Sequence, residues 1–184
     1  MFEKIDCIIG IDPGANGGIT VWRRQEVRTV KMPHDLNGLR DYMEWIKEVS
    51  ECPIAFLERL SVRPDDVNVS GGSANMGKLY RIQKMMQNFE QLKAVLTVEE
   101  IPYIMVHPMK WQNALKVRIK GEEKAERKRR FKEVAGRLYP AIKPTLWNAD
   151  ATLIMHFGRW ALKNDIKWLT KNAPAVMSDL FAKK

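Results

Sequence analysis

Residues 8–20 read IIGIDPGANGGIT, and this stretch governs how the rest of the chain is interpreted. An apolar run leads to Asp12, breaks at a Gly-rich turn and resumes as a second apolar run from Gly18. A run this short, bounded by Gly and Pro, is typical of a buried strand, so Asp12 stands where that strand ends. A carboxylate at a strand end beside flexible backbone suits a metal or phosphate site. The alternative is a β-hairpin in which the Asp merely begins the turn.

The composition predicts one globular domain with a polyanionic partner. The chain has 184 residues, 45% of them hydrophobic, and a net charge of +9. That length allows a sizeable core, and the positive charge favours nucleic acid ahead of an anionic membrane surface. No stretch approaches the roughly 20 apolar residues of a membrane span, so we expect a cytoplasmic protein.

The hydrophobic pattern predicts a mixed sheet with helices on its faces. Strands are expected at residues 4–12, 18–23, 26–32, 53–58 and 101–106, the first three as an antiparallel meander. Helices are expected at residues 35–49, 76–99, 110–115, 123–139 and 147–162, followed by a short amphipathic tail from Pro174. Residues 60–77, which contain Pro, Asn, Ser and Gly, are expected to form a long loop.

Two further carboxylates are candidates to join Asp12. Glu58 ends the 53–58 strand, and if that strand lies beside the first, both acids reach one sheet edge, where open α/β sheets place ligands. Asp150 shares a helix face with Leu153 and Ile154, and a carboxylate facing a core is costly unless it is paired or metal-bound. Singly, Glu58 would be a solvated strand-end residue and Asp150 a first-turn acid favoured by the helix dipole. Together, three oxygen donors suit Mg²⁺ or Mn²⁺, which a basic protein would use in phosphodiester hydrolysis.

Seven short motifs, each weak alone, occur along the chain in a consistent order. They are residues 11–14, Gly17 with Gly18, residues 56–58, the Gly- and Ser-rich loop before a long helix, residues 106–112, the Lys-rich helix ending at residues 138–140, and residues 149–151. Together they resemble the RuvC-like Holliday junction resolvases of bacteria and phages, over about residues 6–162. The resemblance implies an RNase H-like fold: a sheet of three antiparallel and two parallel strands flanked by helices.

The resemblance also implies an activity and a site. It implies a homodimer that nicks two strands of a four-way DNA junction symmetrically, leaving 5′-phosphate and 3′-hydroxyl ends. Matched by motif, Asp12, Glu58 and Asp150 fall on the family's catalytic, metal-binding carboxylates, with Mg²⁺ as the cofactor and Mn²⁺ able to substitute. Residues 1–184 are then expected to form a single nuclease domain, in which residues 168–184 are a tail that packs on the domain or on a second copy.

The sequence departs from that family at the expected fourth metal ligand. The family usually has Asp or His one helical turn before the last Asp, and here Trp147 stands at that position. Tryptophan cannot bind Mg²⁺. We therefore expect Asn148, water or a residue from elsewhere, such as His107, to complete the second metal site, or that site to be weak.

A second departure follows Glu58. Some members of the family carry an aromatic residue there that opens the junction, and here Leu60 and Ser61 take its place. Junction selectivity is therefore a weaker expectation than nuclease activity.

The segment of residues 116–132 holds nine Lys or Arg and three Glu, a net +6. Charges interleaved in this way can form a solvated helix face, but residues 127–130 contain no acid, so we favour phosphate contacts. Two cations at the start of the 76–99 helix could hold the strand near the metals. Trp111 is expected to pack in the core rather than stack on a base. The expected DNA-binding residues are Lys78, Arg81, Lys110, Lys116, Lys120, Lys124, Arg127 and Lys128.

Three alternatives remain open. The first is a non-catalytic junction-binding or nucleic-acid-binding protein that lacks the fourth ligand. The second is another nuclease of the same fold that acts on flaps or on structured RNA or DNA. The third is an actin-like or sugar-kinase ATPase, which also pairs an Asp with glycines after a first strand. That fold normally needs two such domains, and 184 residues are too few for both.

Overall fold

The computed structural model describes residues 4–14, 16–60 and 76–182. In chain order its elements are β1 (Cys7–Asp12), β2 (Gly18–Arg23), β3 (Glu26–Lys31), α1 (Leu36–Val49), β4 (Pro53–Glu58), α3 (Met76–Val98), β5 (Tyr103–Val106), α4 (Pro108–Ala114), α5 (Lys124–Leu138), the 3₁₀ helix η1 (Pro140–Ile142), α6 (Ala149–Asn164), α7 (Ile166–Asn172) and α8 (Pro174–Ala182). The five predicted strands are all present, and the predicted helices correspond to α1, α3, α4, α5, α6 and α8. We did not predict α7, because seven residues are too few to show a helical period. Most of the loop expected at residues 60–77, Ser61 included, lies outside the described residues.

The five strands form one mixed sheet in the order β3-β2-β1-β4-β5. β1 pairs antiparallel with β2, and β2 with β3, while β1–β4 and β4–β5 are parallel. This is the predicted sheet of three antiparallel and two parallel strands. Ile11 lies opposite Leu57 in the parallel pair. Asp12 and Glu58, one residue further on, therefore finish neighbouring strands at the same end of the sheet.

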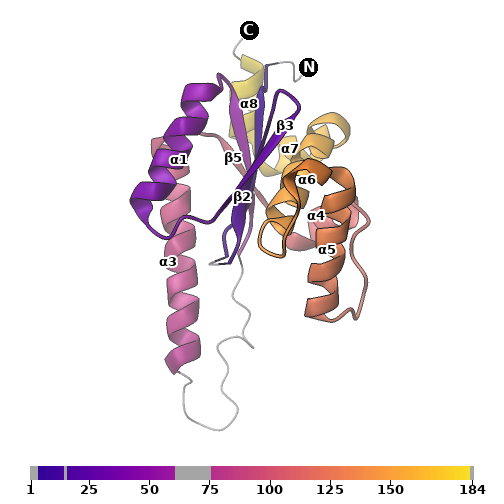
Figure 1. Ribbon diagram of the computed structural model, residues 1–184. Helices are drawn as coiled ribbons and strands as arrows, with labels where there is room; N and C mark the ends of the chain where they lie inside the picture. Colours follow the sequence, from indigo (N-terminus) through magenta and orange to yellow (C-terminus); the bar gives the residue numbers. More distant parts are fainter. Residues whose placement is uncertain (1–3, 15, 61–75, 183–184) are drawn as a thin grey trace.

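Helices cover both faces of the sheet (Figure 1). Alternate residues of β1 point to opposite faces, so Ile9 belongs to the core under α1 and α3, whereas Ile8 belongs to the core under α4 to α8. The tail is part of the second core, because Met177 of α8 is 1% exposed within it.

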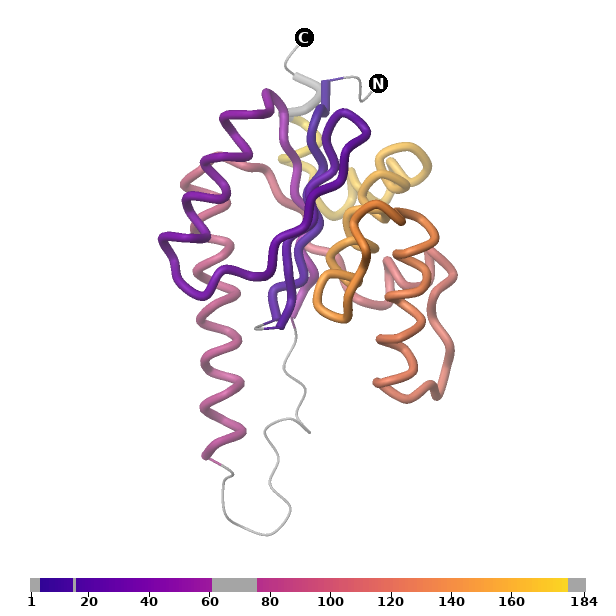
Figure 2. Tube along the Cα trace, viewed as in Figure 1, coloured from indigo at the N-terminus to yellow at the C-terminus, as the bar shows by residue number. Residues whose placement is uncertain are grey.

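The long helix α3 packs on the molecule through one half only. Its buried residues, Phe89, Leu92, Val95 and Leu96, lie in the C-terminal half. Figures 1 and 2 show the N-terminal half extending past the end of the sheet at which β1 and β4 finish. The N-terminal part of α5 also extends past that end, on the other side of the sheet.

Helix α6 lies directly on β1, and this contact positions the last carboxylate. A Cβ atom on Gly10 would lie 2.2 Å from the backbone oxygen of Ala151 and 2.2 Å from the backbone nitrogen of Met155. Only a residue without a side chain therefore permits this approach. Because the helix lies so close to the strand, Asp150 in its first turn reaches the sheet edge where Asp12 ends β1.

Candidate metal centre

The three predicted carboxylates occupy one end of the sheet, each on a different element. Asp12 ends β1, Glu58 ends β4, and Asp150 lies in the first turn of α6. Asp12 is 9% exposed and Asp150 7% exposed, so neither is a solvated surface acid. The three side chains act on one another electrostatically, since both aspartates contribute to the pKa of Glu58.

Asp12 is held by the turn that follows it. The backbone N–H of Gly14 donates to Asp12 Oδ1 at 3.2 Å, as expected where an Asp begins a turn. The two interpretations of the opening stretch are therefore both right, because a hairpin turn starts at a buried strand-end carboxylate. Burial raises the pKa of Asp12, the neighbouring Asp150 raises it further, and Lys128 and the Gly14 N–H oppose the increase.

Glu58 is held by a tryptophan that we predicted only as core packing. Trp111 on α4 is fully buried, which confirms that prediction, and its indole N–H also donates to Glu58 Oε1 at 2.9 Å. Burial raises the pKa of Glu58 to about 8, with Asp12 as the next cause, while Trp111 and Lys128 oppose the increase. The sequence signal for this contact was the placement of Trp111 soon after β5, whose parallel pairing with β4 brings their ends together.

Asp150 is paired with a lysine of the basic helix. Lys128 Nζ lies 2.7 Å from Asp150 Oδ2, and the two side chains are 30% and 10% exposed. Burial alone would lower the pKa of Lys128, but Asp150, Asp12 and Glu58 together raise it. We had expected Lys128 to contact phosphate, and the structure instead places its ammonium group at the carboxylates.

The donor set fits a hard divalent cation. A protein donor holds one oxygen of each carboxylate: Gly14 for Asp12, Trp111 for Glu58 and Lys128 for Asp150. The other oxygen of Asp150, Oδ1, is buried and has no hydrogen-bond partner among the described residues. An unpartnered buried carboxylate oxygen at the end of the sheet that also carries Asp12 and Glu58 suits Mg²⁺ or Mn²⁺.

The three carboxylates are not close enough together to surround one ion. Within the described part of the chain, no three His, Cys, Asp or Glu side chains are close enough to form a metal-binding group. The positive charge at the carboxylates is provided by Lys128.

Trp147, at the position of the missing fourth ligand, packs against the sheet. A Cβ atom on Gly18 would lie 2.9 Å from the ring of Trp147, so this indole packs against the strand residue that pairs with Asp12. Trp147 thus covers the edge of the site without offering a metal ligand.

Both candidate substitutes for that ligand already make hydrogen bonds within the fold. Asn148 Oδ1 accepts from the backbone N–H and the hydroxyl of Thr145 at 2.7 and 3.1 Å, and its amide donates to Thr29 at 3.2 Å. His107 caps α4, with its Nδ1 accepting from the backbone N–H of Met109 at 3.2 Å. A second metal site completed by Asn148 or His107 stays a prediction.

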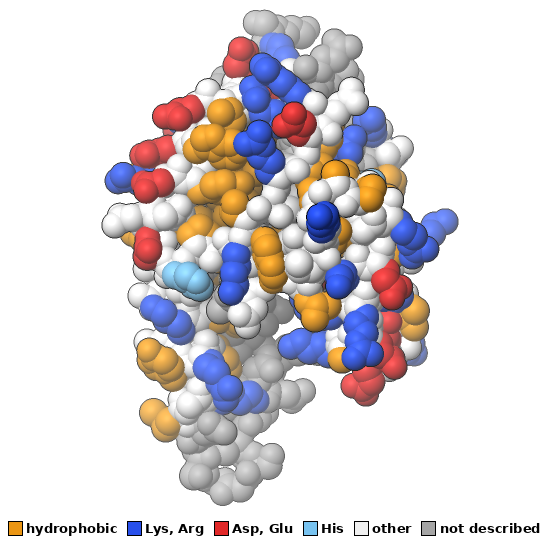
Figure 3. Space-filling view, in the orientation of Figure 1, with side chains coloured by type: hydrophobic (Ala, Val, Ile, Leu, Met, Phe, Trp, Pro, Cys, Tyr) orange, Lys and Arg blue, Asp and Glu red, His pale blue; other side chains and the backbone are white. Residues whose placement is uncertain are grey.

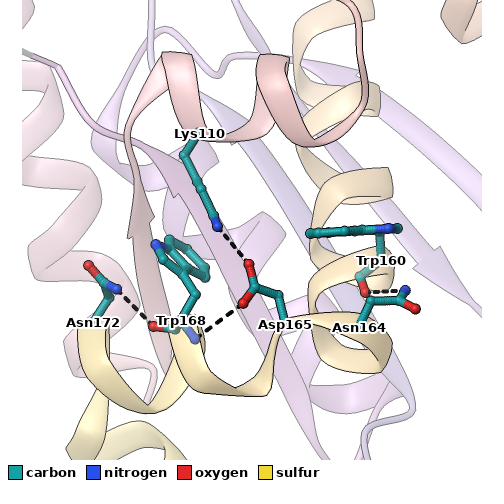
Figure 4. A network of polar contacts seen from close by, with 6 residues as sticks. All are labelled: Lys110, Trp160, Asn164, Asp165, Trp168 and Asn172. Carbon is teal, nitrogen blue, oxygen red and sulfur yellow. Dashed lines mark hydrogen bonds and ion pairs between the residues drawn. The ribbon is translucent and has the colours of Figure 1, made fainter.

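Lys110 is a second expected DNA-binding residue whose ammonium group makes an ion pair within the fold. Figure 4 shows its ammonium group directed at Asp165, with Nζ 2.6 Å from Oδ2 and 5.0 Å from the centre of the Trp168 ring. Asp165 also accepts from the backbone N–H of Trp168 and so caps α7. We therefore assign Lys110 to the support of α4, beside Trp111, rather than to a DNA surface.

The other expected DNA-binding residues lie on the two helices that extend past the sheet, or on the loop before α5. On α3, Lys78 is half-buried, and Arg81 is exposed with its Nε bonded to the Gly77 carbonyl at 3.1 Å. Lys116, Lys120 and Lys124 are exposed, and Arg127 is half-buried. Figure 3 shows Lys and Arg side chains on both sides of the lower end of the molecule. Leu60, where some family members carry an aromatic residue, packs against the core under α1 and α3.

The raised pKa of Glu58 makes the stability of the metal-free protein depend on pH. The unfolded chain loses the Glu58 proton near pH 4.5, whereas the folded protein holds it up to about pH 8. Between these values the folded state binds more protons, so stability is full below pH 4.5 and falls as pH rises toward 8. We expect the Tm in a chelating buffer to fall by several degrees over this interval and the fall to be smaller in a Glu58→Gln variant.

The matched control is Glu48→Gln, which changes an exposed acid of α1. This variant should follow the wild-type curve. An equally steep fall in Glu58→Gln would contradict the burial of an ionisable Glu58.

Comparison with known proteins identifies the fold. The structure is similar to Thermus thermophilus RuvC in complex with a Holliday junction substrate, with a TM-score of 0.54 and 14% identity over 86% of this chain and 96% of that one. A second Thermus thermophilus RuvC structure gives a TM-score of 0.52 and 12% identity over 85% of this chain and 95% of that one. No protein-family model matches the sequence, and no curated protein matches it. The likeness is one of fold, and it confirms the predicted RNase H-like architecture.

No helix in the described ranges is long and apolar enough to cross a membrane.

Proposed function

We propose that this protein is a divalent-metal-dependent endonuclease that hydrolyses phosphodiester bonds in branched DNA, with four-way junctions as its main substrate. The observation that carries the proposal is the placement of Asp12, Glu58 and Asp150 at one end of an RNase H-like sheet, with both aspartates buried, Glu58 half-buried and all three acting on Lys128. The fold supports it as well, since the similar Thermus thermophilus RuvC was solved with a Holliday junction.

The three carboxylates would hold Mg²⁺, with Mn²⁺ able to replace it. A bound divalent ion lowers the pKa of a water molecule and stabilises negative charge on the leaving oxygen. The chain's own contribution is orientation. The Gly14 N–H fixes Asp12 and the Trp111 indole fixes Glu58, so that neither acid has to be ordered when a ligand arrives.

DNA would be bound by cations on both sides of this site. The starts of α3 and α5 both extend past the sheet edge that carries the carboxylates (Figure 1). Cations on both helices would contact phosphates on either side of the scissile bond, because charged side chains dominate such binding. The residues we propose for this role are Lys78, Arg81, Lys116, Lys120, Lys124 and Arg127.

We further propose that the protein acts as a homodimer, because paired symmetric nicks need two sites. The extended half of α3 carries apolar side chains that nothing in the described structure covers. Met76 is 71% exposed and Tyr80 68% exposed. Apolar residues on a protruding helix are candidates for contact with a second copy.

A binding protein without nuclease activity is the second candidate. It is favoured by the ammonium group of Lys128 at the carboxylates and by Trp147 at the usual ligand position. Such a protein would bind branched DNA through the same basic surfaces and leave it uncut.

The deciding experiment compares a four-way junction, a flap and a linear duplex, each incubated with the protein and Mg²⁺ or Mn²⁺. We expect the junction to be nicked at symmetric positions on two strands, at least about tenfold faster than the other substrates, leaving ligatable ends. Equal cutting of all three would leave a nuclease without junction selectivity. Tight binding without any nick, with either metal, would favour the binding protein.

A further inference from the structure

Lys128 belongs to a different element from each carboxylate it acts on. It lies in the second turn of α5, whereas its ion-pair partner Asp150 lies in the first turn of α6. The neighbouring cation Arg130 is bonded to Glu122 and to the backbone oxygen of Val117, which fixes the preceding loop to α5. Two cations within one turn of the basic helix thus form ion pairs inside the molecule.

The charge of Lys128 serves the whole cluster. Its ammonium group lies within hydrogen-bond distance of Asp150 and also acts on Asp12 and Glu58. Without a cation, the buried Asp12 and Asp150 and the half-buried Glu58 would repel one another more strongly, which would favour their protonated forms further. Lys128 reduces that repulsion.

The ammonium group and a divalent ion would both be attracted to the carboxylate of Asp150. Asp150 offers Oδ2 to Lys128, while Oδ1 is buried and unpartnered in the described structure. A divalent ion at Oδ1 would place two cations on one carboxylate a few ångströms apart, where the medium screens them poorly. Lysine is suited to withdraw, because its charge sits on a flexible stem of four carbons.

We propose that Lys128 is a built-in counter-ion that holds the carboxylate cluster together before a metal binds, and that the divalent ion must displace it from Asp150. The ammonium group and the metal then compete for one position. This inference rests on the proposed function, since it takes Asp12, Glu58 and Asp150 as the metal ligands.

The test is the affinity of the full-length, metal-free protein for Mn²⁺, measured by titration calorimetry without DNA. We expect Lys128→Met to bind Mn²⁺ about tenfold more tightly than wild type, because the competing charge is gone. Lys128→Arg keeps the charge and should stay within about threefold of wild type. Lys132→Met is the matched control, since it removes an exposed charge one turn further along α5 and should change nothing.

Thermal unfolding gives a second readout, because removing the Lys128 charge should lower the Tm without metal and enlarge the increase in Tm that metal causes. Without metal, Lys128→Met should unfold several degrees below wild type, because Asp150 loses its counter-ion. Saturating Mn²⁺ should raise its Tm by more than it raises that of wild type. If the Met variant does not fold, Lys128→Gln keeps an N–H donor for Asp150 without the charge and should show the same tighter binding.

The outcomes separate this inference from the proposed nuclease activity. If wild type binds Mn²⁺ and cuts junctions but the Lys128 variants bind with unchanged or weaker affinity, Lys128 is no competitor and the nuclease proposal stands. If the variants bind more tightly and neither they nor wild type cut DNA, the counter-ion stands and the nuclease proposal fails. If no protein in the set binds Mn²⁺, both are overturned.

Discussion

An Asp12→Asn variant is expected to cut branched DNA roughly a thousandfold more slowly than wild type, because it loses the charge of a proposed metal ligand, and metal coordination at such a site supplies several kcal/mol to the transition state. DNA binding should persist, since the proposed phosphate contacts lie on α3, on α5 and on the loop before α5. The loss should therefore appear in the cleavage rate and not in the junction affinity.

The same substitution should leave the metal-free protein at least as stable as wild type. Burial and the neighbouring Asp150 raise the pKa of Asp12, so the fold disfavours its charge, and a neutral amide removes that cost. The measurements are single-turnover cleavage of a labelled junction, a gel-shift titration in a chelating buffer, and thermal unfolding. Asp41→Asn, which changes an exposed acid of α1, is the control and should match wild type in all three. Full cleavage by Asp12→Asn would exclude the site we propose.

Gly10→Val is expected to prevent folding, and Gly10→Ala to cost about 3 kcal/mol or more of unfolding free energy. A Cβ atom at this position would lie 2.2 Å from backbone atoms of α6, and backbone atoms cannot rotate away as a side chain can. The helix would have to move off β1, carrying Asp150 away from Asp12. Soluble yield and the urea midpoint of the purified variants measure the effect.

The control for this prediction is another glycine replaced by the same residue. A Cβ atom on Gly136 of α5 would find no neighbour closer than Pro144, at 4.0 Å. Gly136→Ala should therefore be neutral or slightly stabilising, since alanine is favoured over glycine in a helix. If Gly10→Ala were as mild as Gly136→Ala, the close approach of α6 to the sheet would be contradicted.

The strands were predictable because each carries its signal locally. The run that ends at Asp12 and the run that ends at Glu58 are both apolar and are bounded by turn residues, so their type and ends could be recognised without tertiary information. The convergence of the two acids followed from the parallel pairing of β1 and β4. Asp150 was found because an acid interrupts the apolar face of its helix.

The partners of Glu58 and Asp150 were not predictable, because they come from distant elements. Lys128 precedes the buried Phe131 by three residues and so lies near the packed face of α5, but its contact with Asp150 depends on how α5 packs against α6. Trp111 was correctly placed in the core, but the direction of its indole N–H toward Glu58 is set by packing. The hydrogen bond from the Asn148 amide to Thr29 likewise joins residues far apart in the chain.

Two consecutive residues of α4 connect the candidate site to the last part of the chain. Trp111 holds Glu58, and Lys110 is anchored to Asp165 and lies over Trp168, both beyond the end of α6. The motif resemblance that first suggested the fold fades at residue 162, just short of this anchor. A fragment that ended with the recognisable motifs would keep Asp12, Glu58 and Asp150. It would lose Asp165 and Trp168, which hold Lys110 next to Trp111, the partner of Glu58. The smallest fragment worth expressing therefore includes α7 for this anchor and α8 for the buried Met177, a boundary that the motifs alone do not reveal.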